Sequence, residues 1–231
     1  MVLKTPPFAF HAFLGLAAAF MIGAFAIFVT KLNRASKIAS EKNEKRFFES
    51  WILEAKEGLT SGKTSSLMLY STSNTDAWIA RFEGMPEIKN LYFDSTDLTD
   101  KGIEVISQLP NLRELVIGFG RTQVTNSGIE RLSRNQALET VRLYHLDITD
   151  EGLANLSSFS KLKELTIYSD APRKKGLTES GIRFLKKLSK LKRLEVGGGW
   201  LSEDAVAELR QALPDCNIVE NVEEDNWPFK L

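Results

Sequence analysis

The stretch that decides the fold is Leu109–Ser158, which contains two copies of one pattern. Residues 109–134 read LPNLRELVIGFGRTQVTNSGIERLSR, and residues 135–158 read NQALETVRLYHLDITDEGLANLSS. If two extra residues are allowed in the first loop, both copies share an apolar Leu-x-x-Leu-x-Leu spacing, a loop, Thr-Asp/Asn-x-Gly-Ile/Leu and a final Leu. The recurrence of one pattern at a nearly constant period indicates a repeat protein.

The pattern extends on both sides of this stretch. Units begin at Met85, Leu109, Asn135, Phe159 and Leu188, with lengths of 24, 26, 24, 29 and 25 residues. A degenerate unit precedes them, since Leu67 and Leu69 stand 24 residues before Leu91 and Phe93. The letters LPDCNIV at 213–219 open a further unit. The sequence therefore predicts an array of about six repeats.

Each unit predicts a short strand followed by a helix. Apolar residues two apart point to the same side of a strand, and stacked strands form one parallel sheet. A hydroxyl residue then stands where it can cap a helix, and an Asp, Asn or Glu follows it at the positive end of the helix dipole. A glycine three residues after the cap leaves room for close packing. The expected caps are Thr99, Thr125, Thr149, Thr178 and Ser202, and the glycines are Gly102, Gly128, Gly152 and Gly181.

The helical halves resemble one known repeat family. LTDKGIEVI (98–106), VTNSGIERL (124–132), ITDEGLANL (148–156) and LTESGIRFL (177–185) match the T-x-I-T-D-x-G-L-x-x-L subtype of leucine-rich repeat proteins. The resemblance covers about residues 60–222. LRQALPDCNIV (209–219) is similar to the terminal repeat of short, membrane-anchored bacterial members abundant in planctomycetes. One departure is Ala205, which replaces the helix glycine, as is typical of a terminal repeat.

This resemblance implies a fold and a mode of action. The fold is an α/β solenoid with short parallel strands on a concave face and helices on a convex face. Such a solenoid binds protein partners, and no catalytic residues come with the resemblance. The resemblance thus predicts that this chain is a binding protein, but it does not identify the partner.

An apolar segment precedes the repeats. Residues 8–29 carry no formal charge over 22 positions, which is long enough for a helix to cross about 30 Å of hydrocarbon. We interpret it as a transmembrane anchor; a cleavable signal peptide is the alternative, but its apolar region is shorter, about 7–15 residues. The basic residues that follow it place the repeats in the cytoplasm, with the extracytoplasmic orientation left open. Gly15, Ala19 and Gly23 recur every fourth residue, which would suit a weak homodimer, although small residues are common in such helices.

The segments follow one another in a simple order. They are the anchor with its basic flank (1–37), an amphipathic helix (38–60), the repeat array (61–222) and a tail (223–231). The amphipathic helix, with expected ends at Ser40 and Gly58, either caps the core of the first repeat or lies on a lipid surface. The tail, with Trp227 and Phe229, is either a disordered linear motif or a segment folded over the last repeat.

Strand residues between the inward apolar ones are predicted to face the concave side. All four tyrosines of the chain fall in this set, and we expect a binding face that contains Tyr70, Tyr92, Asp94, Glu114, Arg142, Tyr144 and Tyr168. Tyrosine offers large, rigid, amphipathic contact area at low entropic cost. The alternative is that tyrosine simply favours strands.

The longest loops are predicted to lie on one rim of the array. GFGRTQ (118–123) and SDAPRKKG (169–176) both lengthen the connection between strand and helix, and insertions often mark the binding side. Their basic residues are Arg121, Arg173, Lys174 and Lys175. Trp200 lies on the same edge, as a rim contact or as a plug over the last repeat. A tolerated, solvated loop is the alternative for both insertions.

The composition argues against several classes of function. Four of the 30 basic residues flank the anchor, which leaves 26 basic against 30 acidic residues in 38–231 and disfavours a nucleic-acid partner. Cys216 is the only cysteine, and His11 and His145 are isolated, so no nucleophile–base pair, metal cluster or phosphate loop is evident. We expect a non-enzymatic protein without cofactor, metal or small-molecule substrate.

Together these observations predict a membrane-anchored interaction module. It would bind a protein partner of unknown identity on the concave face and the loop rim. The alternative is a structural or assembly factor of a membrane complex, in which the repeats serve as a scaffold.

Overall fold

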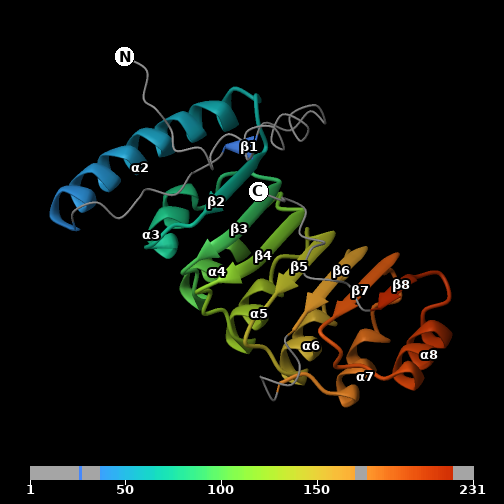
Figure 1. Ribbon diagram of the computed structural model, residues 1–231. Coiled ribbons are helices and arrows are strands. Elements are labelled where there is room, and N and C mark those ends of the chain that lie inside the picture. The colour runs from blue at the N-terminus through green and yellow to red at the C-terminus, as the bar shows by residue number, and fades with distance from the viewer. Residues whose placement is uncertain (1–25, 28–36, 170–175, 221–231) are drawn as a thin grey trace, which may run out of the picture.

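The computed structural model describes residues 26–27, 37–169 and 176–220. The strands form one parallel sheet whose spatial order is the chain order (Figure 1). They are β1 (Ala26–Ile27), β2 (Ser66–Tyr70), β3 (Asn90–Thr96), β4 (Glu114–Gly120), β5 (Thr140–Tyr144), β6 (Glu164–Tyr168), β7 (Arg193–Gly197) and β8 (Asn217–Glu220). The predicted α/β class with a solenoid-like, repetitive arrangement is confirmed.

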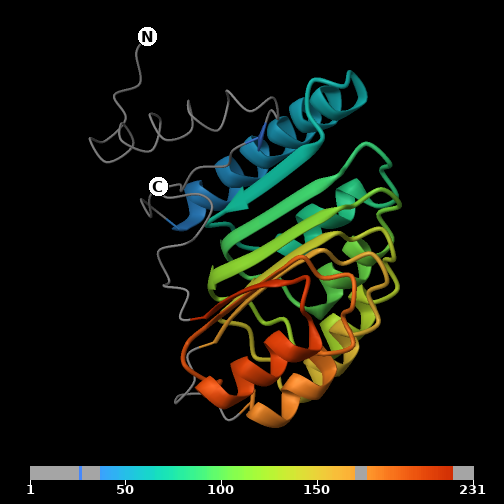
Figure 2. The ribbon, with the colours of Figure 1, turned by 90° about the vertical axis from the view of Figure 1, so that its right-hand side faces the viewer.

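The repeat helices lie along one face of this sheet (Figures 1 and 2). They are α3 (Thr75–Ile79), η1 (Ala80–Phe82), α4 (Asp100–Ser107), α5 (Asn126–Leu132), α6 (Asp150–Leu156), η2 (Glu179–Gly181), α7 (Ile182–Leu185) and α8 (Glu203–Ala212). A longer helix, α2 (Lys37–Thr60), precedes them. Strand and helix therefore alternate once per repeat, as the apolar spacing predicts.

One continuous core fills the space between sheet and helices. The inward strand pairs are all buried: Leu67/Leu69, Leu91/Phe93, Leu115/Ile117, Val141/Leu143, Leu165/Ile167 and Leu194/Val196. The helix pairs that meet them are also buried: Ile103/Ile106, Ile129/Leu132, Leu153/Leu156, Ile182/Leu185 and Val206/Leu209. Because each unit has only one apolar face, this core exists only when neighbouring units stack.

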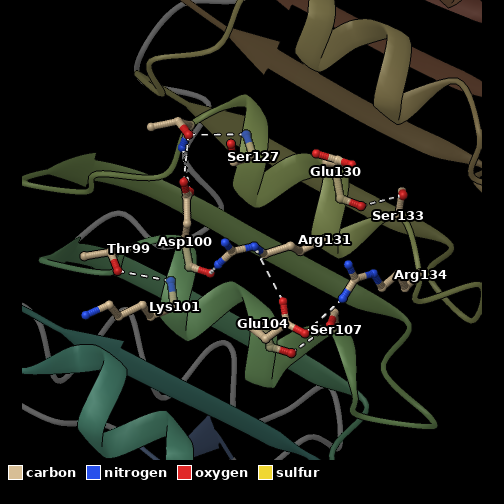
Figure 3. A network of polar contacts seen from close by, with 11 residues as sticks. Thr99, Asp100, Lys101, Glu104, Ser107, Ser127, Glu130, Arg131, Ser133 and Arg134 are labelled. Carbon is tan, nitrogen blue, oxygen red and sulfur yellow. Dashed lines mark hydrogen bonds and ion pairs between the residues drawn. The ribbon is translucent and has the colours of Figure 1, made fainter.

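The predicted hydroxyl caps are confirmed. The side chain of Thr99 accepts a hydrogen bond from the backbone N–H of Lys101, and Thr125 accepts one from Ser127 (Figure 3). Thr149 and Thr178 make the equivalent bond at their helices, and Ser202 caps α8 by accepting from Ala205. These bonds satisfy backbone donors that the first helical turn leaves open.

The residue after each cap threonine connects one repeat to the next. The carboxylate of Asp100 accepts from the backbone N–H of Thr125 at 2.9 Å and from its hydroxyl at 2.7 Å. Asp76 holds Thr99, and Asp150 holds Thr178, in the same way. A two-point bond from a carboxylate fixes both the position and the rotation of the following cap.

Two variants of this bond occur along the array. Asn126 accepts from the backbone N–H of Thr149 through its carbonyl oxygen and donates to the Thr149 hydroxyl through its amide. Glu179 makes one bond, which it accepts from the backbone N–H of Ser202 at 3.1 Å. The last unit is therefore joined to its neighbour by one such hydrogen bond, where the earlier units are joined by two.

The recurrence of glycine at one position of each internal repeat is explained by the same Asp and Asn side chains. A methyl group at Gly128 would lie 2.4 Å from Oδ1 of Asp100 and 2.9 Å from Cγ1 of Val124. The same overlap with the preceding Asp or Asn side chain is found at Gly102, Gly152 and Gly181. Ala205 occupies this position in the last unit, where the longer Glu179 replaces aspartate. Glycine is thus required because it makes room for the carboxylate between repeats.

We predict that Asp100→Ala and Gly128→Ala each lower the free energy of unfolding by about 1–3 kcal/mol, through lost hydrogen bonds and steric overlap respectively. Since removal of the carboxylate makes room for the methyl group, the double variant should lose less than the sum. Urea unfolding measures the three values, with Lys101→Ala in the same turn as a control. Additive losses would contradict this coupling.

Helix α2 is longer at both ends than the sequence predicts. It begins at Lys37, so Ser40 lies inside it instead of capping it, and it passes through Gly58 to Thr60. The chain leaves the helix at Gly62, whose φ of 73° suits glycine and whose N–H donates to the carbonyl of Leu59. Packing of its apolar face, which includes Leu59, continues past Gly58 and outweighs that local signal.

The apolar face of α2 packs on the first repeat. Phe48 stacks on Trp78 with 4.5 Å between the ring centroids, and Trp51 meets Phe82 edge-on at 5.8 Å. Phe48, Trp51 and Ala55 are buried in the main core. Arg81 of η1 also forms a bidentate ion pair with Glu49 of α2. Phe48 and Trp51 therefore cover apolar surface that the first repeat would otherwise expose.

The predicted anchor lies almost entirely outside the described residues. Within it, only Ala26 and Ile27 are described, and they are extended as β1 beside Ser66 and Leu67, where the sequence predicts a helix. The spacing of Gly15, Ala19 and Gly23 falls outside the described residues. Among the residues that are described, no helix is both long and apolar enough to span a membrane.

The N-terminus of α3 is capped by Asp97, a residue of the following repeat. Its carboxylate accepts from the backbone N–H groups of Asn74 and Thr75 at 2.9 and 2.8 Å, while Asn74 itself makes no side-chain cap. Burial raises the pKa of Asp97, but the hydrogen bonds from Thr75 and Asn74 outweigh it and hold the pKa below its ordinary value.

We predict that Asp97→Asn destabilises the protein at neutral pH and that the difference shrinks in acid. A depressed pKa in the folded state stabilises above the unfolded-state pKa of about 4 and stops doing so as the pH falls through the folded-state value. Denaturant unfolding of both chains between neutral pH and about pH 3 measures the difference. A gap that is constant across this range would contradict the assigned role.

Candidate functional site

The candidate site is the face of the sheet opposite the helices, here called the open face. The strand register aligns its side chains in rows that run across the array. The first row is Ser66, Asn90, Glu114, Thr140, Glu164 and Arg193, and the second is Met68, Tyr92, Val116, Arg142, Thr166 and Glu195. The third row contains Tyr70, Asp94 and Gly118, then Tyr144, Tyr168 and Gly197. None of the described helices covers this face (Figure 2).

Arg142 lies at the centre of a charged network on the open face. Its Nη1 lies 2.5 Å from Oε1 of Glu114 on β4, and its Nη2 lies 3.0 Å from Oε2 of Glu164 on β6. The hydroxyl of Tyr92 donates to the other Glu114 oxygen at 2.9 Å. Four neighbouring strands thus contribute to one network that orients the guanidinium group. Its carboxylates outnumber its cation, so this centre carries a net negative charge.

An apolar cluster lies beside this network. Val116 and Tyr144 have 0% and 1% of their surface exposed, and Tyr92 and Tyr168 pack against them. The rings of Tyr144 and Tyr168 are nearly parallel, with centroids 6.5 Å apart. These four residues, here called the tyrosine cluster, give the open face an apolar centre.

A second polar group lies toward the last strands. The buried carboxylate of Glu195 accepts from the Thr166 hydroxyl at 2.7 Å and from Nε of Arg193 at 2.8 Å. Arg193 keeps 45% of its side chain exposed. Its guanidinium group is thus the more accessible of the two arginines on the open face, since Arg142 exposes 22%.

Burial changes the acid–base properties of this face. Burial, followed by the charge of Glu114, raises the pKa of Tyr92 far above its ordinary value. Burial likewise raises the pKa of Tyr144 to about 12, although Arg142 opposes this shift. The pKa values of Asp94 and Tyr70 are also raised, mainly by burial. Both central phenols are therefore neutral at physiological pH, and that of Tyr92 donates its hydrogen bond to Glu114.

The structure brings the predicted strand residues of the site together. Tyr70, Tyr92, Asp94, Glu114, Arg142, Tyr144 and Tyr168 all lie on the open face in adjacent rows. Thr166 and Glu195, which the sequence does not single out, lie in the second row of the same face and are hydrogen-bonded to each other. Thr166 on β6 and Glu195 on β7 lie 29 positions apart in the sequence. Only the stacking of the two strands brings their side chains within hydrogen-bonding distance.

The predicted rim residues have different outcomes. Arg121 is exposed directly after β4, but the predicted loop is shorter than expected because residues 118–120 extend that strand, with Gly120 paired to Thr96. Arg173, Lys174 and Lys175 lie outside the described residues. The predicted basic rim is thus represented in the described part of the chain by Arg121.

Trp200 is a core residue instead of a rim contact. It is 7% exposed and belongs to the main core, which corresponds to the predicted plug over the last repeat. Gly198 and Gly199, with φ values of 90° and 69°, make the preceding turn. Gly198 also approaches the backbone of Ser169 so closely that a methyl group would lie 1.5 Å from its carbonyl oxygen. Glycine is therefore required there both for conformation and for space.

Comparison with known proteins gives no family. No profile of a protein family matches the chain, and no curated protein sequence matches it significantly. Across the described residues, no three His, Cys, Asp or Glu side chains are grouped so that they could hold a metal ion. The arrangement of the open face itself is therefore the basis of the functional argument.

We predict that the buried phenols titrate well above the ordinary tyrosine pKa of about 10. A raised pKa in the folded state stabilises fully below the unfolded-state value, and this contribution is lost as the pH rises from about 10 through about 12. Ultraviolet titration of the phenolate should show an alkaline step that Tyr144→Phe removes. If all four tyrosines ionise together near pH 10 in the folded chain, the described burial is wrong.

Proposed function

We propose that this chain is a non-enzymatic interaction protein, a leucine-rich repeat module that binds a protein partner on its open face. The observation that carries the proposal is the pair of partly exposed tyrosines, Tyr92 and Tyr168, which pack on the buried Val116 and Tyr144 beside the oriented Arg142. Tyrosine and arginine are the residues that most often dominate the energy of protein interfaces. The resemblance of the repeat motifs to leucine-rich repeat proteins supports the same function.

The geometry of the open face favours a protein partner over a small molecule. Its polar and aromatic groups extend in rows across several strands instead of converging in one deep cavity. Arg142 is held by two carboxylates and the phenols are packed, so little side-chain entropy is lost when a partner docks. A broad, pre-ordered surface with an apolar centre and a polar surround is typical of a protein interface.

The proposal includes attachment to a membrane through residues 8–29, with the repeat domain in the cytoplasm. Its support is the length and composition of that segment and the basic residues after it, since the segment lies outside the described residues apart from Ala26 and Ile27. Protease protection of the repeat domain in sealed membranes, compared with opened ones, determines the orientation.

We predict that Tyr168→Ala and Arg142→Gln each weaken partner binding about tenfold or more. Crosslinking in native membranes, followed by quantitative capture, compares each variant with the unchanged chain. Arg131→Ala and Lys187→Ala on the helix side are the matched controls, because they also remove long cations. Thermal unfolding verifies that each variant remains folded. Equal capture by all chains would overturn the proposed binding face.

The alternative function, assembly of a membrane complex, places the essential contacts in the N-terminal segments. Deletion of residues 1–36 tests it, because this deletion removes the apolar segment and retains α2, whose aromatic residues cover the first repeat. A binding module should still capture its partner after this deletion. Loss of the partner from a folded truncated chain would favour the assembly function.

A further inference from the structure

Basic side chains are concentrated at the amino ends of β6 and β7. The stretch RFLKKLSKLKR (183–193) contains six basic residues and no acidic one, although residues 38–231 carry more acidic than basic groups. The turns before the two strands both read Ser-Lys-Leu-Lys, at 160–163 and at 189–192. Two neighbouring repeats thus produce a local excess of positive charge in a chain whose folded part is acidic overall.

The two turns present their lysines to solvent side by side. In a parallel sheet the amino ends of all strands lie at one edge, so the turns from helix to strand line up there (Figure 2). The backbone N–H of Lys192 donates to the carbonyl of Lys163 at 2.7 Å, which holds the turns in register. Leu162 and Leu191 are buried, and the lysines on either side of each leucine are exposed. We call these four residues the lysine edge: Lys161, Lys163, Lys190 and Lys192.

The repeat pattern does not require lysine at these positions. The strand register aligns the lysine pairs with residues of other types in the two repeats before them, Asn111/Arg113 and Ala137/Glu139. A leucine stands between the two residues in every one of these turns. The leucine is needed for the core, whereas the lysines are a property of two particular repeats.

The register brings like charges together at the lysine edge. Lys163 lies in register with Glu139 on one side, where the two form an ion pair at 2.6 Å that lowers the pKa of Glu139. On the other side it lies in register with Lys192, and like charges placed opposite each other destabilise a sheet. Across the described residues, no ion pair neutralises Lys161, Lys190 or Lys192. The arrangement opposes folding, which favours a role in binding.

We propose that the lysine edge binds the anionic headgroups of a membrane surface. Clusters of four or more lysines and arginines are of the size that attracts acidic lipids, and the attraction falls off within a Debye length of the surface. Lys187, which follows α7 and is exposed, adds a further cation to the same region. Because the turns lie at one edge of the sheet, their ammonium groups can approach a single plane together.

The composition of the edge favours lipid over a protein partner. Lysine is depleted at protein interfaces, where arginine and aromatic residues are enriched. The ammonium group is a compact, strongly hydrated charge on a flexible stem, and it lacks the rigid, planar fork by which arginine binds one carboxylate. The exposed neighbours of the lysines in the turns are the small residues Ser160 and Ser189. A diffuse attraction to a charged plane needs no fixed geometry, and flexible lysines suit it.

This binding would orient the array and goes beyond the capture of a protein partner. The strands begin at the lysine edge and run away from it, so the sheet would stand upright on the membrane. Both the open face and the helix face would then remain accessible to soluble proteins. The lysine edge and the open face are separate surfaces, and each can therefore be tested without the other.

A fluorescent dye that brightens near lipid tests the proposal in the purified full chain. In a Cys216→Ser background, Ser189→Cys carries the dye at the lysine edge, and Ser127→Cys carries it at the opposite edge as the control. Vesicles of phosphatidylcholine with phosphatidylserine should brighten the dye at position 189, whereas vesicles of phosphatidylcholine alone should not. The response should disappear at high salt, where charges are screened over a few ångströms. Flotation with the neutral vesicles reports attachment through residues 8–29 separately, and no protein partner is needed.

Charge variants identify the residues responsible. In the chain labelled at position 189, Lys192→Gln should lower the ratio of docked to undocked chain about fivefold. Lys101→Gln removes the same charge at the opposite edge and should leave the ratio unchanged. An equal response to neutral and anionic vesicles, or equal responses at positions 189 and 127, would overturn the proposal. So would a dye at position 189 that responds to polyglutamate or duplex DNA but not to anionic vesicles, because the edge would then recognise another polyanion.

Discussion

The structure depends on one repeated interaction, in which the cap threonine of one repeat hydrogen-bonds to an Asp or Asn side chain of the repeat before it. A cap threonine that only capped its own helix would leave its backbone N–H and hydroxyl hydrogen without a partner. Asp100 accepts both from Thr125, and Asp76 and Asp150 do the same for Thr99 and Thr178. Each repeat thus completes the polar bonding of its neighbour while their leucines share one core.

This connection also fixes the arrangement of the open face. Because successive helices are held at one offset, the strands that precede them pair in constant register, and side chains line up in rows. Arg142 can therefore reach Glu114 and Glu164 on the strands at either side. The additional residues of the longer repeats do not disturb this register, since they extend β4 or lie in the connection that follows β6. The proposed interface is a product of the regular stacking, and its chemistry comes from the positions that differ between repeats.

The two ends of the array are closed by different means. At the beginning, the aromatic residues of α2 pack on the first repeat, and Asp97 caps α3 from the following unit. At the other end, Trp200 turns inward on two glycines with positive φ, and Ala205 replaces the usual glycine beside Glu179. Both ends use larger or longer side chains than the internal repeats, because a terminal unit lacks one neighbour to bury its core.

The amino-acid sequence by itself determined the α/β class, the repeat boundaries, the inward leucines, the hydroxyl caps and the strand residues of the open face, because these follow from local periodicity. It did not determine the bond from Asp100 to Thr125, the burial of Val116 and Tyr144, or the core position of Trp200. Only the tertiary structure decided these features, since each depends on the distance between repeats and on which side chains meet across it. The same reason explains why α2 passes Gly58: its contacts with the first repeat outweigh its local end signal.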